Sequence, residues 1–148
     1  MSQTPVCELC AGDGGEVLWR HAQLRVVLVD EPDYPGFCRV IWNAHVKEMT
    51  DLAPAQRTLL ANAVWAVEAA QRAVMQPEKV NLATLGNMTP HVHWHVIPRF
   101  TDDRHFPSPV WAEPRRAADE ATLAARRALL PQLRDAVRQQ LDAAGLTA

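Results

Sequence analysis

Short apolar runs bounded by turn residues predict four strands along this chain. The runs are rich in β-branched residues and lie at 24–29, 38–42, 80–85 and 91–97. The turn-forming segment at 30–36, with two prolines and a glycine, joins the first two runs directly. Because short connections usually join neighbouring strands, these two are expected to pair.

Two longer segments have the three- and four-residue apolar spacing of amphipathic helices. The first spans 51–75, and Thr50 and Asp51 are its candidate N-cap residues. Its apolar stripe consists of Leu60, Ala63, Val67, Ala70 and Val74. The second begins near residue 115 and contains Pro131, which should break it or start a new turn. Its apolar face consists of Leu130, Leu133, Val137 and Leu141.

This order of elements predicts an α+β fold, in which a long helix and a C-terminal helix accompany an antiparallel sheet. With 148 residues, 48% of them hydrophobic, the chain suits a single domain with its own core. We expect the domain, residues 1–148, to have its core at about 20–100. A lead-in at 1–19 and a proline-rich loop with a helix at 101–148 would complete it.

Composition and charge exclude several classes of function. The formal net charge is -2 with interspersed signs, so no basic patch for a nucleic-acid polymer is expected. No apolar run approaches the ~18 residues that span a bilayer, so no membrane segment is expected, and no signal peptide is visible. Three cysteines do not make a disulfide framework. These features together predict a cytoplasmic protein with reduced thiols.

Three histidines alternate with apolar residues in the fourth predicted strand. Alternate side chains of a strand share one face, so His91, His93 and His95 are expected in a row, ~6.6 to 6.8 Å apart along the strand. The intervening side chains should point into the core, namely Val92, Trp94 and Val96. Such a row favours a functional site over an incidental cluster.

Two chemistries suit this row of imidazoles. The histidines could ligate a catalytic metal, helped by Asp102 or Asp103 in the loop that follows. Alternatively, one histidine acts as a nucleophile while its neighbours position phosphate oxygens and protonate the leaving group. The residues alone leave both hypotheses open.

The segment 81–97, NLATLGNMTPHVHWHVI, resembles the signature of the histidine triad (HIT) family, in which single apolar residues separate three histidines. The stretch 35–45 resembles that family's earlier strand and the histidine that follows it. The resemblance implies a HIT-like fold, a homodimer and a nucleotide hydrolase or transferase. Such an enzyme acts on the α-phosphate of a nucleoside phosphoramidate or a dinucleoside polyphosphate.

The resemblance also implies roles for single residues. His93 would attack the α-phosphorus and form a covalent nucleotidyl-histidine, which water or another acceptor resolves. A neutral imidazole suits this role, because its unperturbed pKa is about 6.5. His95 would hydrogen-bond the phosphate or help the leaving group depart, and Asn81 would orient the phosphate region.

The same resemblance implies how the substrate, an adenine nucleotide or another purine nucleotide, would be held. Asp30 would lie near the ribose hydroxyls, and Gly86 and Asn87 would line the phosphate pocket. Trp111, in the proline-rich stretch, is a candidate for the pocket wall, although packing under the C-terminal helix explains it equally well.

Three positions depart from the family pattern, and one of them is Asn87, which stands where the family often has Gln. Phe37 stands where many members have a histidine, so one supporting histidine is missing. Met88 stands where Ser or Thr is common, so the hydroxyl that contacts phosphate is absent or supplied by Thr89. These departures make a nucleotide-binding regulator without turnover the non-enzymatic alternative.

Cys7 and Cys10 form a C-x-x-C pair, whose spacing lets two thiolates bind one tetrahedral zinc ion. A redox pair is disfavoured because the cysteines precede every predicted strand, and two inert thiols are the remaining alternative. By resemblance to zinc-holding relatives, His45 and His91 would complete a structural zinc site. No organic cofactor is expected, and His105 is expected at the surface.

Overall fold

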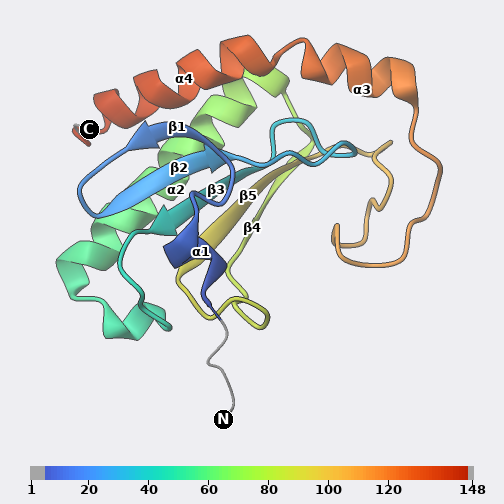
Figure 1. The fold of residues 1–148 in the computed structure, drawn as a ribbon. Coiled ribbons are helices and arrows are strands. Elements are labelled where there is room, and N and C mark those ends of the chain that lie inside the picture. Colours follow the sequence, from blue (N-terminus) through green and yellow to red (C-terminus); the bar gives the residue numbers. More distant parts are fainter. Residues whose placement is uncertain (1–5, 147–148) are drawn as a thin grey trace.

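The computed structural model describes residues 6–146, which contain a five-stranded antiparallel sheet (Figure 1). Its strand order is β1-β2-β3-β5-β4. The strands are β1 (Glu16–Arg20), β2 (Leu24–Leu28), β3 (Cys38–Trp42), β4 (Lys79–Ala83) and β5 (His93–Arg99). The predicted α+β fold with an antiparallel sheet is confirmed.

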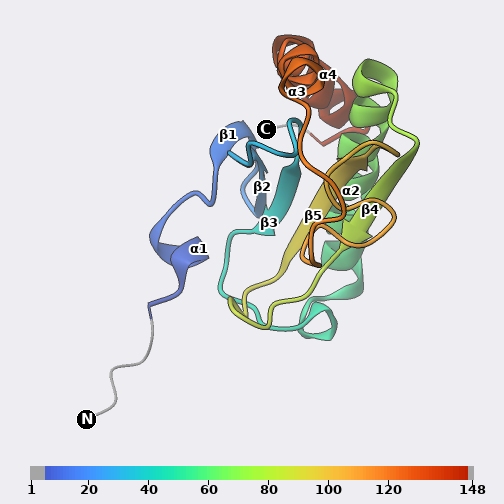
Figure 2. The ribbon, with the colours of Figure 1, turned by 90° about the vertical axis from the view of Figure 1, so that its right-hand side faces the viewer.

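Two helices, α2 (Pro54–Met75) and α4 (Leu130–Ala143), lie on one side of the sheet and pack against each other (Figures 1 and 2). The short helix α1 (Glu8–Ala11) lies on the other side. A 3-10 turn, η1 (Met49–Asp51), precedes α2, and α3 (Glu120–Arg127) precedes α4. Within the described residues, no helix has the length and apolar character that crossing a membrane requires.

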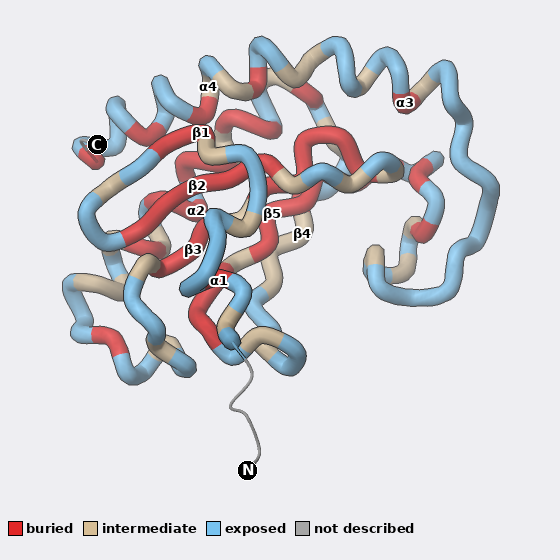
Figure 3. Tube along the Cα trace, in the orientation of Figure 1, coloured by how far each residue is buried: buried red, intermediate tan, exposed pale blue. Residues whose placement is uncertain are grey.

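The main core lies between the sheet and these two helices. Alternate residues of the central strands point toward α2, among them Val26, Val40 and Val96, all fully buried. Each such aliphatic side chain contributes roughly 1.5–3 kcal/mol through its burial. Figure 3 shows the buried positions concentrated along the central strands. The predicted stripe of α2 faces this core, with Leu60, Ala63, Val67 and Ala70 buried and Val74 half-buried.

The helix boundaries differ from the predicted ones for local reasons. Helix α2 begins at Pro54 because residues 49–51 form η1 and because proline, which lacks an N–H, suits a first helical turn. The Gln56 side chain caps this end by accepting the N–H of Ala53 at 2.8 Å. The C-terminal helical segment consists of two helices, and Pro131 lies in the first turn of the second, where it starts a new helix.

Two strands also differ from the predictions. The pattern does not predict β1, a short edge strand that pairs with β2 through an irregular register. The strand predicted at 91–97 begins at His93 and continues through Pro98 to Arg99. His91 therefore precedes the strand, and this shift divides the three histidines between two sites.

Candidate functional site

The sheet face that turns away from α2 carries the candidate site. Residues directly opposite each other in an antiparallel pair share a face. Strand β3 places Ile41 opposite His93 and Arg39 opposite His95, and β4 places Ala83 on the other side of His95. His93 and His95 thus lie on one face, as predicted, with ring centroids 4.9 Å apart.

The imidazole of His93 has one nitrogen tied to the backbone. Its Nδ1 lies 2.6 Å from the carbonyl oxygen of His91, which can only accept a hydrogen bond. Nδ1 therefore carries the proton, and the lone pair of the neutral ring resides on Nε2. The side chain is 8% exposed, so its orientation is set by the surrounding strand and loop.

His95 is enclosed by aromatic rings. Phe37 approaches it edge-on at 5.6 Å between centroids, and Trp111 of the proline-rich loop lies 5.1 Å away. Burial, followed by the charges of His93 and Arg39, lowers the pKa of His95 to about 4, so this ring is neutral at pH 7. Its Nδ1 is buried and has no hydrogen-bond partner among residues 6–146.

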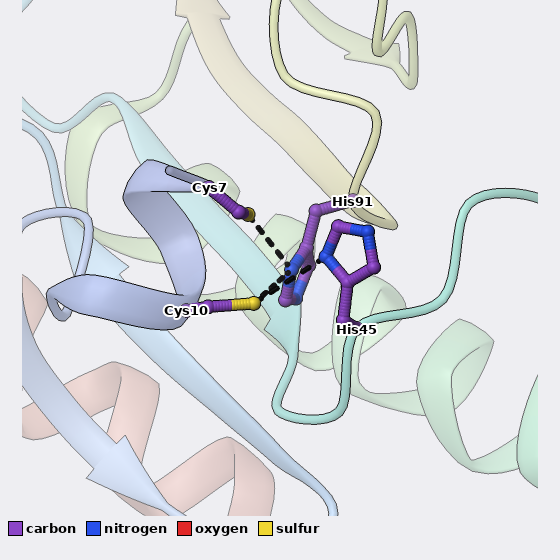
Figure 4. A group of neighbouring side chains, drawn as sticks. All are labelled: Cys7, Cys10, His45 and His91. Atoms are coloured by element: carbon purple, nitrogen blue, oxygen red, sulfur yellow. Dashed lines mark hydrogen bonds between the residues drawn. The ribbon is translucent and has the colours of Figure 1, made fainter. Parts of the chain in front are cut away.

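His91 is turned toward the N-terminal cysteines, which lie on the same side of the sheet as His93 and His95, so its ring joins a second cluster and not the other two imidazoles (Figure 4). Its Nε2–H donates to the carbonyl oxygen of Trp42, which leaves the Nδ1 lone pair facing the thiols. Nδ1 lies 3.4 Å from Sγ of Cys7 and 3.5 Å from Sγ of Cys10. Sγ of Cys10 is also 3.3 Å from Nδ1 of His45.

The donor atoms of Cys7, Cys10, His45 and His91 all lie within 4.8 Å of one another. In a tetrahedral zinc site, bonds of about 2.3 Å to sulfur and 2.0–2.1 Å to nitrogen place such donors about 3.5 Å apart. The observed sulfur–nitrogen distances of 3.3 to 3.5 Å match that spacing. Two thiolates and two neutral imidazoles are also a donor set that zinc prefers, so the residues fit this metal.

Arg25 holds the N-terminal segment against the sheet. Its guanidinium donates to the carbonyl oxygens of Leu9 at 2.7 Å, Asp13 at 2.9 Å and Gly12 at 3.1 Å. Leu9 packs on Val27 and Ile41 beside it. The hydrophobic pattern does not single out Arg25, although an arginine in the middle of an apolar strand is a signal that its charge serves a partner.

The loop between β4 and β5 carries three predicted pocket residues, Gly86, Asn87 and Thr89. Gly86 has φ +79°, a conformation that favours glycine. The carbonyl oxygen of Thr89 accepts the N–H of His91 at 2.8 Å. Asn87 is exposed, and Gly86 lines a cavity of about 350 Å³ together with His91. The loop thus lies beside the cysteine–histidine cluster.

Asp30 follows strand β2 at the start of the 30–36 turn. It is exposed and lines a cavity of about 490 Å³ with other residues of this turn, together with Arg127 of α3 and Arg134 of α4. Neither His93 nor His95 lines this cavity.

The two acids considered as catalytic metal ligands are both paired. Asp103 is buried, and its carboxylate accepts from Nε of Arg99 at 2.8 Å and from Nη2 at 3.1 Å. Burial acts to raise the pKa of Asp103, but hydrogen bonds from Arg99 and the backbone outweigh it and lower that pKa. Asp102 pairs with Arg126 at 2.7 Å. Of the two acids that the catalytic-metal hypothesis named, neither is therefore free of a cationic partner.

A buried group of polar side chains joins the proline-rich loop to the rest of the domain. The hydroxyl of Tyr34 lies 2.6 Å from Nδ1 of His105 and donates to Asp103 at 3.2 Å. His105, expected at the surface, is 8% exposed because it takes part in this group. Arg99 is a second residue that the hydrophobic pattern does not single out. It shares the face of His93 and His95, since the alternation continues past Pro98.

Comparisons with solved structures agree with the fold described above. A histidine triad protein from Bradyrhizobium japonicum is 25% identical with a TM-score of 0.69, over 86% of this chain and 91% of its own. One from Marinobacter aquaeolei is 24% identical with a TM-score of 0.68, over 90% and 97%. A zinc-bound histidine triad family protein from Mycobacterium smegmatis is 24% identical with a TM-score of 0.64, over 93% and 96%.

No protein with a curated description matches the sequence. The sequence model of the HIT domain, however, matches residues 15–102, which contain the sheet, α2 and the three triad histidines. Because this match covers more than half of the chain, the protein belongs to the HIT domain family.

Proposed function

We propose that this protein hydrolyses or transfers a nucleoside monophosphate, with His93 as its nucleophile. The observation that carries the proposal is the hydrogen bond from Nδ1 of His93 to the carbonyl oxygen of His91, at 2.6 Å. This bond selects the tautomer in which Nε2 has a lone pair, the form that a nucleophilic imidazole needs. A solved structure from Sulfolobus tokodaii, 17% identical to this chain, is described as a hypothetical histidine triad nucleotide-binding protein.

In the first step, Nε2 of His93 attacks the α-phosphorus of the nucleotide. A phosphorus–nitrogen bond to His93 forms while the bond from phosphorus to the leaving group breaks, and the leaving group departs with the electron pair and takes up a proton from solvent. In the second step, water attacks the phosphorus and gives a proton back to solvent, the electron pair of the phosphorus–nitrogen bond returns to Nε2 of His93, and a nucleoside monophosphate is released. Such transfers depend on positioning and on charge stabilisation around the phosphoryl oxygens.

His95 and Arg39 would stabilise charge at the phosphorus. Because Nδ1 of His95 is buried without a partner, the proton of this neutral ring resides better on Nε2, where it can donate to a phosphoryl oxygen. Arg39 lies directly opposite His95 in the sheet and supplies a positive charge on the site face. Asn81 would contribute its side-chain amide as a further donor, and Gly86, Asn87 and Thr89 would border the phosphate.

Cys7, Cys10, His45 and His91 would hold a structural zinc ion. When bound, zinc supplies a cross-link between the N-terminal segment and the loop that precedes β5. The nucleophile is not a ligand of this cluster, so metal binding and phosphoryl transfer use separate residues.

A homodimer remains part of the proposal. Strand β4 is an edge of the sheet, and its free backbone groups are a surface on which a second copy can extend the sheet. The mass of the protein in solution, measured by light scattering, tests this directly, and a monomeric mass at all concentrations contradicts it.

A second function, nucleotide binding without turnover, is favoured by one observation. Phe37 offers His95 only a ring edge, and Nδ1 of His95 is left without a hydrogen-bond partner. A histidine at position 37 would supply one. If the missing hydrogen bond to His95 prevents turnover, Phe37→His should gain turnover that the natural protein lacks.

The test is turnover of adenosine 5′-phosphoramidate by the wild type and by His93→Ala, each with and without chelator. Turnover by the wild type alone, together with a trapped nucleotidyl-protein adduct, supports the covalent mechanism. Loss of activity on chelation of a protein that stays folded supports a catalytic metal instead. Nucleotide binding by both proteins without turnover, on dinucleoside polyphosphates as well, supports the binding function.

A further inference from the structure

The guanidinium of Arg99 is held rigidly at the end of β5. Its side chain is 2% exposed, and it lies between the rings of Tyr34 and Phe106, each 5.7 Å away. Nε and Nη2 donate to the carboxylate of Asp103, and Nη2 also donates to the carbonyl oxygen of Ser108 at 2.7 Å. This set of contacts leaves Nη1 as the nitrogen that serves a different partner.

That partner is Asn81, whose Oδ1 accepts a hydrogen bond from Nη1 of Arg99 at 2.7 Å. A guanidinium has only donors, so this contact assigns which end of the Asn81 amide is oxygen and which is nitrogen. Nδ2 of Asn81 is therefore directed away from Arg99, and it makes no hydrogen bond to another described residue. Asn81 lines a cleft of about 410 Å³ together with Trp111.

The register of the sheet places Asn81 close to the site histidines. Asn81 pairs with Ile97, and the next position on the same face, Ala83, pairs with His95. Asn81 and His95 are therefore diagonal neighbours on one face, with Cα atoms roughly 7–8 Å apart. Trp111, which lines the cleft, also contacts the ring of His95.

We propose that Arg99 is a positioning residue that fixes the amide of Asn81 with its N–H groups toward the phosphoryl oxygens. The inference rests on the function proposed above and adds a role for a residue outside the triad. Without Arg99, the amide can rotate and present Oδ1, whose lone pairs repel a phosphate. Arg99 thus selects one of two orientations that are nearly equal in shape.

A double-mutant cycle tests this role, with kcat and KM measured for wild type, Asn81→Ala, Arg99→Lys and the double variant. Loss of one preorganised donor lowers kcat by about 100-fold, so we expect that effect for Asn81→Ala. We expect about a 10-fold loss of kcat for Arg99→Lys with KM unchanged, since the Asn81 amide would contact the phosphoryl oxygens in the transition state. The double variant should be much faster than the product of the two single losses predicts, because Lys keeps a positive charge beside Asp103 and the change acts on kcat mainly through Asn81.

Multiplicative losses in the double variant would overturn the proposal, because they mean that Arg99 acts independently of Asn81. Val137→Ala, a buried truncation in α4 away from the site, is the control for lost stability. It should lower the melting temperature without changing kcat. A kcat loss in this control as large as that of Arg99→Lys would assign the Arg99 effect to general destabilisation and would also overturn the proposal.

A measurement on the folded wild type does not depend on turnover. In a ¹⁵N-labelled sample, the side-chain NH₂ signals of Asn81, identified by their absence from Asn81→Ala, should show a rigid amide. These signals should shift when adenosine 5′-monophosphate is added. A freely mobile Asn81 amide overturns the inference even if the enzyme is active, whereas a rigid amide in a protein without turnover supports the inference and rejects the proposed function.

Discussion

Two irregular segments lie on the site face of the sheet, and they are anchored in different ways. The N-terminal segment (residues 7–14) is held by Arg25 and by a cluster of two thiols and two imidazoles. The proline-rich loop (residues 101–118) is held by Asp103, whose carboxylate is paired with the buried Arg99. The loop therefore contains its own counter-charge, whereas the donors of the N-terminal cluster converge on one another.

This difference indicates which of the two segments depends on a ligand for its stability. A buried ion pair with its hydrogen bonds completed is stable as the chain folds it. A set of sulfur and nitrogen donors gains most of its cohesion when a metal ion neutralises the thiolates. We therefore expect the N-terminal segment to respond to metal and the proline-rich loop to respond to substitution within the chain.

The largest effect on stability is expected for Asp103→Ala. This change leaves the guanidinium of Arg99 buried without a counter-charge, which costs about 3–5 kcal/mol. Urea unfolding monitored by tryptophan fluorescence measures the loss. Asp102→Ala, which removes a largely exposed partner of Arg126, is the control and should cost less than about 1 kcal/mol. Equal losses in the two variants would show that burial of the pair has no special weight.

Metal removal is expected to have the next largest effect. A ligand present at 100 times its Kd stabilises the folded state by about 2.7 kcal/mol, and chelation should remove this amount. The measurement is thermal unfolding with and without chelator, together with elemental analysis for zinc. Cys10→Ser should be insensitive to chelator. A wild type that contains no zinc and unfolds identically in both conditions would reject the metal site.

A pH-dependent effect of about the same size or smaller is expected from His95, beneath Trp111 of the loop. Its folded pKa of about 4 lies below the unfolded value of about 6.5, so the unfolded chain binds the extra proton between these values. This stabilising contribution is complete above pH 6.5 and is lost as pH falls toward 4. From pH 7 to 5, metal-free wild type should lose about 2 kcal/mol more than His95→Gln. Parallel pH profiles would contradict this.

The smallest effect on stability is expected for Trp111→Ala. The side chain is 53% exposed, so its removal should cost less than about 1 kcal/mol. Its contact with His95 predicts a loss of kcat/KM of about 3- to 10-fold, equivalent to about 1 kcal/mol. Trp65→Ala, which removes a similarly exposed tryptophan from α2, is the control and should leave kcat/KM unchanged. If both variants have the same kinetics, Trp111 does not border the site.

The alternation of residues in β5 predicts correctly that His93 and His95 share a face, because side-chain direction in a strand follows from local geometry. The alternation does not reveal that the ring of His91 joins the two cysteines and His45 instead of the other two imidazoles. The chain before β5 is set by contacts with the loop after β3, where the N–H of Val92 donates to the carbonyl oxygen of Val46. Arg99 is missed because the predicted strand ends at Ile97, before Pro98, whereas β5 continues to Arg99.

By itself, the sequence determined the elements that depend on local periodicity, the α+β class and, through the triad signature, the family. Tertiary structure alone decided the partners of the site residues. Cys7 and His91 are 84 positions apart, and Tyr34 and Asp103 are 69 apart, yet each pair is in contact. Local patterns constrain backbone dihedrals and side-chain faces, whereas such distant contacts depend on how the sheet, the N-terminal segment and the proline-rich loop pack together.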